Sequence, residues 1–258
     1  MKCSQIIDVI EKTYPKEEAE SWDNVGLLAG RYDKEVKQIY VGVDLSEAAI
    51  DHAIEMGIDM IVTHHPLIYS PIKSVTDGDF IGKRIVKLLQ NDISYYAMHT
   101  NYDILRMADV AAHRLGIENT EVLEVTNEAG EKGVGKIGTL GISLKSKECA
   151  VLVRNLFELR NVRIFGDREK KVNKIAILPG SGEKYIKAAL EKGADILITG
   201  DIGHHAGIDA AAQGMCIIDA GHYGIEHIFI EDVSAFLEKE LEEVKVTGES
   251  VVQPFIVI

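Results

Sequence analysis

"IYVGVDLSEAAIDHAIEMGIDMIVT" occupies residues 39–63 and is typical of a strand, a helix and a second strand. Its aliphatic ends indicate buried strands, and Gly57 stands where the helix would end. Shifted by 136 residues, the stretch aligns without a gap to "IAILPGSGEKYIKAALEKGADILIT" (175–199), and eight of the 25 positions are identical. Strand–helix–strand units in general share aliphatic strands and a terminal glycine, and these common features explain some of the identities. They explain less easily the Asp and the Thr that bracket the second strand in both halves. We therefore interpret the match as two related α/β halves.

Strand-like and helix-like segments alternate along the rest of the chain, which predicts an α/β protein built from two related domains with mixed sheets. The polar, glycine-rich stretch "TNEAGEKGVG" (126–135) is the expected boundary, giving domains at 1–125 and 126–258. Near the C-terminus, "EHIFIEDVSAFLEKELEEV" (226–244) predicts an amphipathic helix and "VVQPFIVI" (251–258) a last strand. This helix and strand can pack back on the first domain.

Composition limits the classes of partner. The chain has 258 residues and a formal net charge of −13, so general binding to nucleic acid is unfavourable. No apolar stretch approaches the roughly 20 residues of a membrane helix, and the acidic start does not resemble a signal peptide. Cys3, Cys149 and Cys216 form no CxxC pair and are expected to be reduced core residues. We expect a soluble cytoplasmic protein that binds no membrane.

Histidines gather after the predicted strands. Each half carries an adjacent histidine pair and a histidine followed four residues later by a carboxylate, and these residues are His64, His65, His99 and Asp103 in the first half and His204, His205, His222 and Glu226 in the second. Loops at the carboxyl ends of strands line ligand crevices in α/β sheets, so both halves can bring these side chains to one interdomain cleft. His227 stands directly beside the second group, and only His52 and His113 lie elsewhere, within amphipathic helices, where a surface role is expected.

Imidazole and carboxylate together form the ligand set that zinc, iron, manganese and cobalt accept, and several converging groups can hold two ions. Taken singly, each group has an ordinary alternative. A His-Pro step at a strand end is often a hydrogen-bonded turn, one His-x-x-x-Glu arises by chance, and His204-His205 can simply cap a helix. Taken together, their number and placement favour a metal site.

Two glycine-rich motifs carry less information. "GVGKIG" (133–138) matches a dinucleotide-binding pattern, but strand-like residues follow it where a helix is required, so we interpret it as a tight turn or hairpin. "LPGSGEKYI" (178–186) joins a strand to a helix start, where either an anion site or a plain helix cap is compatible with the sequence. The sequence predicts no organic cofactor site.

The chain resembles the Nif-three-like family, whose members carry the name GTP cyclohydrolase I type-two homologue. The stretches that carry the resemblance are "SWDNVGLLAG" (21–30), "VGVDLS" (41–46), "VTHHPLIYSPIKS" (62–74), "YAMHTNYD" (96–103), "LITGDIGHHAGIDAAAQG" (197–214) and "DAGHYGIEH" (219–227). Their order along nearly the whole chain is far more specific than any one of them. This chain resembles the compact form, which lacks an inserted central domain.

The resemblance implies a two-domain subunit of a ring-like homohexamer with two divalent ions per subunit, of zinc, iron or manganese. The implied metal ligands are His64, His65, Asp103, His222 and Glu226. The resemblance also implies that His99, His204 and His205 do not bind the metals directly and instead either contact the ligands or face the substrate. We predict that His99 and His205 are the catalytic, proton-transferring residues. Trp22, Asp23 and Asn24 lie in the family's other characteristic loop.

The resemblance also implies a hydrolase with a small-molecule nucleotide substrate. We expect water to attack C8 of the guanine ring of GTP, giving 7,8-dihydroneopterin triphosphate and formate. One alternative is metal-dependent hydrolysis of another nucleotide or phosphoester. The other is a non-enzymatic metal-binding scaffold or adaptor, in which protein ligands would close the coordination of each ion.

Overall fold

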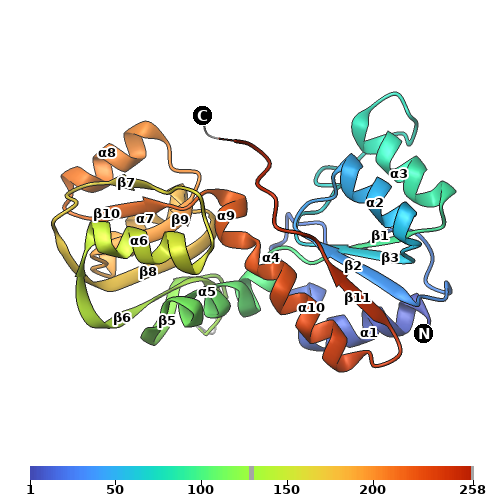
Figure 1. Ribbon diagram of the computed structural model, residues 1–258, viewed down its shortest axis with the longest axis horizontal. Helices are drawn as coiled ribbons and strands as arrows, with labels where there is room; N and C mark the ends of the chain where they lie inside the picture. Colours follow the sequence, from blue (N-terminus) through green and yellow to red (C-terminus); the bar gives the residue numbers. More distant parts are fainter. Residues whose placement is uncertain (128–130, 257–258) are drawn as a thin grey trace. The chain divides into compact units, whose positions relative to one another are not determined.

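The structure is a computed structural model that describes residues 1–127 and 131–256, and its chain divides into two compact units. The first unit comprises residues 1–102 and 229–251. The second comprises residues 103–228 and the described residues from Val252 onward. Figure 1 shows the elements of both units in the colours of the sequence.

A five-stranded mixed sheet forms the centre of the first unit, in the order β1-β4-β3-β2-β11. Only β1 is antiparallel to its neighbour; the other pairs are parallel. The strands are β1 (Gly26–Ala29), β2 (Gln38–Gly42), β3 (Met60–Thr63), β4 (Ser94–Ala97) and β11 (Lys245–Gly248). Every residue of β3 and β4 is buried, as expected for central parallel strands with both faces covered.

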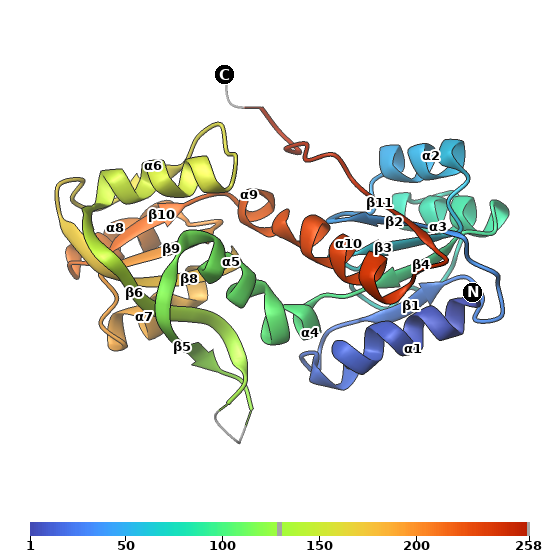
Figure 2. The ribbon, with the colours of Figure 1, turned by 60° about the horizontal axis from the view of Figure 1, so that its bottom comes forward.

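Helices cover both faces of this sheet, with α2 and α3 on one side and α1 and α10 on the other (Figure 2). The helical segments are α1 (Cys3–Thr13), a 3₁₀ turn (Lys16–Glu18), α2 (Glu47–Met56), α3 (Phe80–Gln90), α4 (Thr100–Tyr102) and α10 (Ile228–Glu240), which begins one residue before the unit does. The predicted helix boundaries around α2 are confirmed. The Ser46 hydroxyl caps its start, and Gly57 ends it in the left-handed region with a φ of 66°.

The second unit holds a six-stranded mixed sheet in the order β5-β6-β8-β9-β10-β7. The β8–β9 and β9–β10 pairs are parallel, and the other pairs are antiparallel. The strands are β5 (Ile117–Val125), β6 (Gly133–Lys145), β7 (Arg163–Phe165), β8 (Lys171–Ser181), β9 (Ile196–Gly200) and β10 (Cys216–Asp219). The motif "GVGKIG" lies in β6, which pairs with β5, so its interpretation as part of a hairpin is confirmed.

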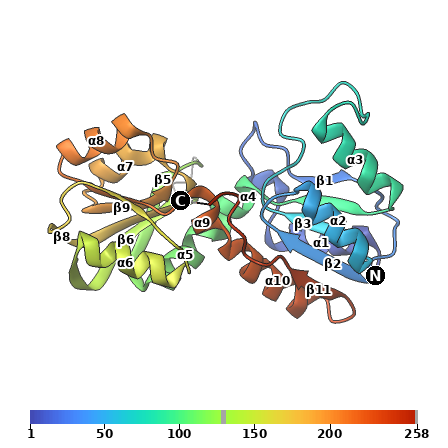
Figure 3. The same ribbon diagram turned by 45° about the horizontal axis from the view of Figure 1, so that its top comes forward.

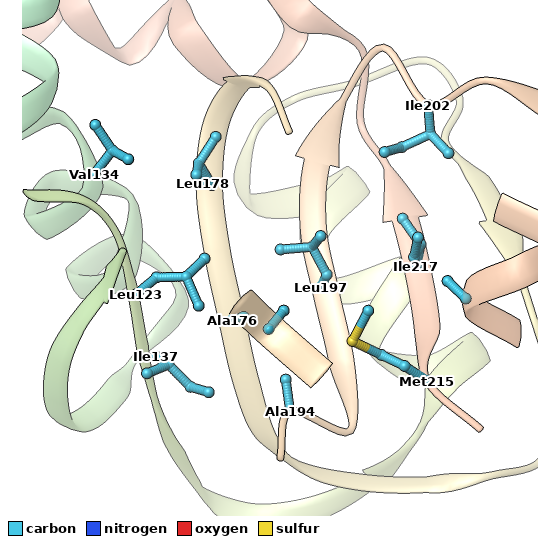
Figure 4. Close-up of a cluster of buried hydrophobic side chains, with 12 residues drawn as sticks. Leu123, Val134, Ile137, Ala176, Leu178, Ala194, Leu197, Ile202, Met215 and Ile217 are labelled. Atoms are coloured by element: carbon cyan, nitrogen blue, oxygen red, sulfur yellow. The ribbon is translucent and has the colours of Figure 1, made fainter. Parts of the chain in front are cut away.

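Figure 3 shows α7 and α8 on one side of the second sheet and α5 and α6 on the other. The helical segments are a π-helical turn (Asp103–Met107), α5 (Ala108–Leu115), α6 (Ser146–Leu156), a 3₁₀ turn (Glu183–Tyr185), α7 (Ile186–Glu191), α8 (His204–Ala212) and α9 (His222–Glu226). Alternate strand residues point to opposite faces. Ala176, Leu197 and Ile217 therefore lie in one core cluster (Figure 4). The helix residues Ala189 and Ala210 belong to the same cluster.

Strand register supports the internal repeat seen in the sequence. Ile39 pairs with Met60 in the first sheet, and the residues 136 positions further on, Ile175 and Ile196, pair in the second. The Asp59 carboxylate accepts hydrogen bonds from the backbone N–H groups of residues 37 and 38 (2.8 and 3.1 Å). Residue 195, also Asp, accepts them from residues 173 and 174 (2.9 and 3.0 Å), again 136 positions on. The two halves thus share one β-α-β design down to individual hydrogen bonds.

The units begin and end elsewhere than the sequence indicated. The chain first passes from the first unit to the second between Tyr102 and Asp103. The expected boundary at 125/126 lies inside the second unit, between the paired strands β5 and β6. Part of that glycine-rich stretch, 128–130, lies outside the described residues.

The C-terminal helix and a strand do belong to the first unit, where β11 pairs in parallel with β2. That strand is Lys245–Gly248, so the predicted strand at 251–258 is wrong over its described part, 251–256. Within the described residues, none of the helices has the length and apolar character that crossing a bilayer requires.

Candidate metal centre

His64 and His65 directly follow β3, and the neighbouring backbone holds them in place. Their N–H groups donate to the carbonyls of Gly42 and Val43, which continue the parallel pairing beyond the strand (3.2 and 2.9 Å). The buried Tyr95 hydroxyl donates to the His65 carbonyl (2.9 Å). Burial raises the pKa of Tyr95 to about 12, so this hydroxyl remains a donor at neutral pH. The strand end therefore fixes the backbone from which both imidazoles project.

Each of these two imidazoles is held at Nδ1 by an acceptor. Nδ1 of His64 lies 2.9 Å from the Met98 carbonyl, and Nδ1 of His65 lies 2.8 Å from a carboxylate oxygen of Asp44. Because a carbonyl or carboxylate can only accept, each Nδ1 carries the proton and donates. In the neutral ring this leaves the lone pair on Nε2, the tautomer of a histidine that binds metal through Nε2.

His99, two residues after β4, follows the same rule. Its Nδ1 donates to Asp23 (2.8 Å), a carboxylate whose side chain is fully buried. Burial would raise the pKa of Asp23, but hydrogen bonds from His99 and from the hydroxyl and N–H of Thr100 outweigh it and lower the pKa to about 2. An ionised Asp23 is therefore present at neutral pH to orient His99.

The three imidazoles of the first unit converge. One ring nitrogen from each of His64, His65 and His99 lies within 4.8 Å of the other two. Ring centroids are separated by 4.8 Å for His64–His65, 5.2 Å for His64–His99 and 5.6 Å for His65–His99. His64 is fully buried, and the other two are partly exposed. Three imidazole donors at this spacing form a group that can hold a divalent ion.

Asp103, a predicted ligand, is the first residue of the second unit. It opens the π-helical turn Asp103–Met107, between α4 and α5, and is partly buried. Single π-helical turns are rare and are frequent at functional sites, because the extra residue redirects side chains. The local backbone is thus unusual at the position where the sequence predicts a carboxylate ligand.

The second unit brings His222 and Glu226 together on α9. Nε2 of His222 lies 3.1 Å from a carboxylate oxygen of Glu226, and Nδ1 of the same imidazole donates to Asp201 (2.7 Å). Glu226 is buried with 3% of its surface exposed. His222 therefore has the same Nδ1-donor arrangement as the three histidines of the first unit.

Glycine makes room for this pair. Gly180 lies in β8 at a φ of 82°, and a Cβ there would stand 2.5 Å from Oε1 of Glu226 and 3.8 Å from Nε2 of His222. Gly200, at the end of β9, would place a Cβ 2.6 Å from the backbone nitrogen of His222. Of the two glycines of "LPGSG", Gly180 thus packs against α9, whereas Gly182 packs against Thr199 and caps the 3₁₀ turn that follows.

The donor chemistry of these residues fits a divalent transition metal. His64, His65, His99 and His222 each have Nδ1 engaged by a carbonyl or carboxylate, which leaves Nε2 as the atom that can bind a metal, and a buried carboxylate lies beside His222. Neutral imidazole and carboxylate suit zinc, iron and manganese, and fixed partners at the second ring nitrogen are typical of metal-binding histidines.

The other histidines belong to none of the ligand groups found among the described residues. His227, next to Glu226, is buried, and its Nδ1 lies 3.0 Å from the Gly224 carbonyl. His204 and His205 begin α8, are exposed, and have ring centroids 5.1 Å apart; Gly203, not a histidine, is the capping residue. His52 and His113 are exposed on helices, as expected.

Sequence reasoning gave no positioning role to three residues beside the candidate ligands: Asp44, Asp201 and Gly180. Their signals were their places at strand ends and, for the two acids, their presence in stretches that carry the family resemblance. Asp44 follows β2, Asp201 follows β9, and Gly180 stands near the end of β8.

Comparisons with known proteins agree with this fold. Residues 1–254 match the family described as Duf34/NIF3 (NGG1p interacting factor 3), and the chain belongs to this family. A Clostridium acetobutylicum protein named GTP cyclohydrolase 1 type 2 homolog is 32% identical over 246 residues, which cover 94% of this chain and 92% of that protein. A Streptococcus pneumoniae protein of the same name is 35% identical over 94% of this chain and 92% of its own length.

Solved structures give the same result. A Bacillus cereus protein related to NIF3 matches with a TM-score of 0.94 and 26% identity, covering 100% of this chain and 99% of that one. Reduced HcgD from Methanocaldococcus jannaschii matches with a TM-score of 0.84 and 32% identity over 96% and 97% of the two chains. The resemblance read from the sequence and the predicted α/β class with mixed sheets are confirmed.

Proposed function

We propose that the protein is a metal-dependent hydrolase that opens the guanine ring of GTP, releasing formate and forming 7,8-dihydroneopterin triphosphate. The observation that carries the proposal is the group of His64, His65 and His99, whose ring nitrogens converge within 4.8 Å and so place a proton-transferring imidazole beside two proposed metal ligands. The relatives named GTP cyclohydrolase 1 type 2 homolog supply the candidate substrate.

In this proposal His64, His65, Asp103, His222 and Glu226 bind two divalent ions of zinc, iron or manganese. Such ions, when bound, polarise substrate oxygens and lower the pKa of water toward 7. The Met98 carbonyl, Asp44 and Asp201 keep Nδ1 of the ligand imidazoles protonated, so that Nε2 remains a donor to metal. The role of these three groups is orientation.

His99 transfers the proton in this scheme. Asp23 fixes its Nδ1, so its Nε2 is the basic atom, and the ionised Asp23 stabilises the imidazolium that forms on protonation. His205, exposed at the start of α8, is proposed as a second proton-transferring group that faces substrate.

The test is formate release from GTP by protein reconstituted in turn with zinc, iron and manganese, with products identified by mass. Release of phosphate or nucleoside without formate would replace GTP ring opening by phosphoester or nucleotide hydrolysis. No turnover on a nucleotide panel, together with retained metal, would favour a non-enzymatic scaffold. His113→Ala is the matched control, because His113 is an exposed histidine outside the candidate site.

Two variants separate ligation from proton transfer. We expect His64→Ala to lose both bound metal and turnover. His99→Ala should keep its metal and lose about 10²- to 10⁴-fold in turnover, the usual contribution of a general acid or base. If His99→Ala loses as much metal as His64→Ala, His99 is a ligand and its catalytic assignment is wrong.

We also propose that the subunits assemble into a homohexamer, as the family resemblance implies. Sedimentation equilibrium of the full chain, with and without added divalent metal, measures the oligomer directly. A monomer or dimer under both conditions would contradict the hexamer and leave the catalytic proposal intact.

A further inference from the structure

Trp22 and Tyr69 are two exposed aromatic side chains that lie against each other beside the histidine group. Their ring centroids are 5.8 Å apart, and Trp22 lies 6.0 Å from His99 in an edge-to-face arrangement. Trp22 is 50% exposed and Tyr69 is 58% exposed. Single exposed aromatics are ordinary, but a contacting pair next to converging imidazoles is not explained by packing within the unit.

The backbone beneath these rings is firmly held. Asp23, the next residue after Trp22, accepts hydrogen bonds from His99 and Thr100. Asn24 then donates its side-chain amide to the carbonyl of Ile68 (2.6 Å), the residue before Tyr69. The two loops are therefore tied to each other, so the rings are presented as a pair although neither is buried. Rigid presentation reduces the ordering cost of binding a ligand.

We propose that Trp22 and Tyr69 form a stacking platform for the purine ring of the substrate. The inference rests on the proposed function for the choice of purine and on the geometry for the platform. Flat aromatic rings bind nucleobases through their faces, with little dependence on hydrogen bonds. A base stacked on Trp22 lies next to His99, so the platform would position the ring to be opened. Both residues are positioning residues in this scheme.

The chain offers a direct probe, because Trp22 is its only tryptophan. Fluorescence excited at the red edge of the tryptophan band reports on this one ring. With metal-loaded protein we expect saturable quenching by guanosine and by GTP, and none by inorganic tripolyphosphate or ribose 5-phosphate. Free N-acetyltryptophanamide corrects for absorption by the nucleotide. Equal quenching by tripolyphosphate, or no saturable change with any purine, would overturn the platform.

Tyr69→Leu removes one ring and leaves the probe in place. We expect it to weaken guanosine binding about 5- to 100-fold, the range that stacking of one base on an aromatic side chain provides. Tyr32→Leu is the matched control, since Tyr32 is a 60% exposed tyrosine of the same unit. Equal affinities of the two variants would contradict the proposal. Circular dichroism checks that both are folded.

The kinetic readout separates this inference from the proposed reaction. If GTP is turned over, Trp22→Leu and Tyr69→Leu should raise KM with little change in kcat, because stacking binds the ground state and the transition state alike. If formate is never released but guanosine still quenches Trp22, the platform stands and the reaction fails. Emission that shifts with protein concentration alone, and no longer does so in Tyr69→Leu, would identify a subunit contact and overturn the platform.

Discussion

At the end of β3 the first unit carries His64 and His65, whereas the positions 136 residues further on, at the end of β9, carry Gly200 and Asp201. In the same way Asp44, which orients His65, corresponds to Gly180. Strand register matches between the halves, so these are equivalent places in one frame. The first unit puts imidazoles directly on strand ends. In the second unit, glycines leave space for α9, which carries His222 and Glu226.

A duplicated β-α-β frame therefore fixes where a site can form but not which element supplies the candidate ligands. A side chain at position 200 and the backbone of His222 cannot occupy the same space, because a Cβ would lie 2.6 Å from that nitrogen. The equivalent position therefore carries a ligand-type side chain in one half, His64, and a glycine that leaves room for α9 in the other, Gly200.

Gly200→Ala should produce the largest effect on stability. The added methyl would meet three backbone atoms of Gly221 and His222 at 2.6–2.8 Å, none of which can rotate away. We expect a loss of about 3 kcal/mol, the upper part of the usual range for overpacking, and weaker metal binding at His222. Urea unfolding followed by circular dichroism measures the loss. Gly141→Ala is the control, because no heavy atom lies within 4 Å of its added Cβ; equal midpoints would show that α9 does not need the glycine.

Replacing the acids that orient the histidines should have a smaller effect, on metal affinity and not on folding. Asp44→Asn and Asp201→Asn keep a side-chain acceptor near Nδ1 but remove its charge. Asn also tolerates the left-handed backbone of Asp201, whose φ is 57°. We expect each to weaken metal binding by about 10-fold, the lower end for such partners. Competition with a metal-binding dye measures the affinity, and Asp33→Asn, at a highly exposed acid, is the control. Unchanged affinity in one variant alone would show that the two units do not use these acids alike.

The sequence predicted the parts of the molecule that depend on short-range patterns. Aliphatic strands, the Ser46 cap and the Gly57 stop placed the repeated β-α-β segments, and the spacing of histidines identified the candidate site. The unit boundary failed because a glycine-rich stretch is typical of a linker, whereas here it joins two long strands that pair through their backbones. The apolar end "VVQPFIVI" was taken for a strand, but Pro254 has no N–H to donate, and the more polar "KVTG" pairs with β2 instead.

The orienting contacts of the site could not be predicted, for a different reason. Asp23 and His99 are 76 residues apart, and Asp44 and His65 are 21 apart. Only the folded sheet brings each acid to its imidazole, and many acids of this chain would have matched the pattern equally well. Residue type and spacing thus grouped the candidate residues, the family resemblance supplied the predicted ligand set, and the three-dimensional structure was needed for the groups that set the tautomers of the imidazoles.

The smallest predicted effect concerns the acids that both halves share, Asp59 and Asp195. Each accepts two backbone N–H groups, from residues 37 and 38 at the start of β2 and from residues 173 and 174 within β8. Replacing either acid by Ala removes those acceptors, but water can reach the partly exposed positions. We therefore expect each substitution to lower the free energy of unfolding by about 1 kcal/mol at neutral pH. Similar losses of unfolding free energy at the two positions would support the equivalence of the halves, and a loss at only one position would contradict it.

Asp195 adds a pH dependence to this test. Burial would raise its pKa, but hydrogen bonds from the N–H groups of Asn173 and Lys174 and the charge of Lys170 lower it overall. A carboxylate with a lowered folded-state pKa contributes its full stability above its ordinary pKa of about 4 and loses it as the pH falls through the folded value. The stability difference between the unsubstituted protein and Asp195→Ala should therefore be constant near neutral pH and shrink below about pH 4. A stability difference that grows on acidification would mean that the protonated form of Asp195 is the stabilising one. The hydrogen bonds to its carboxylate would then not be the source of its contribution to stability.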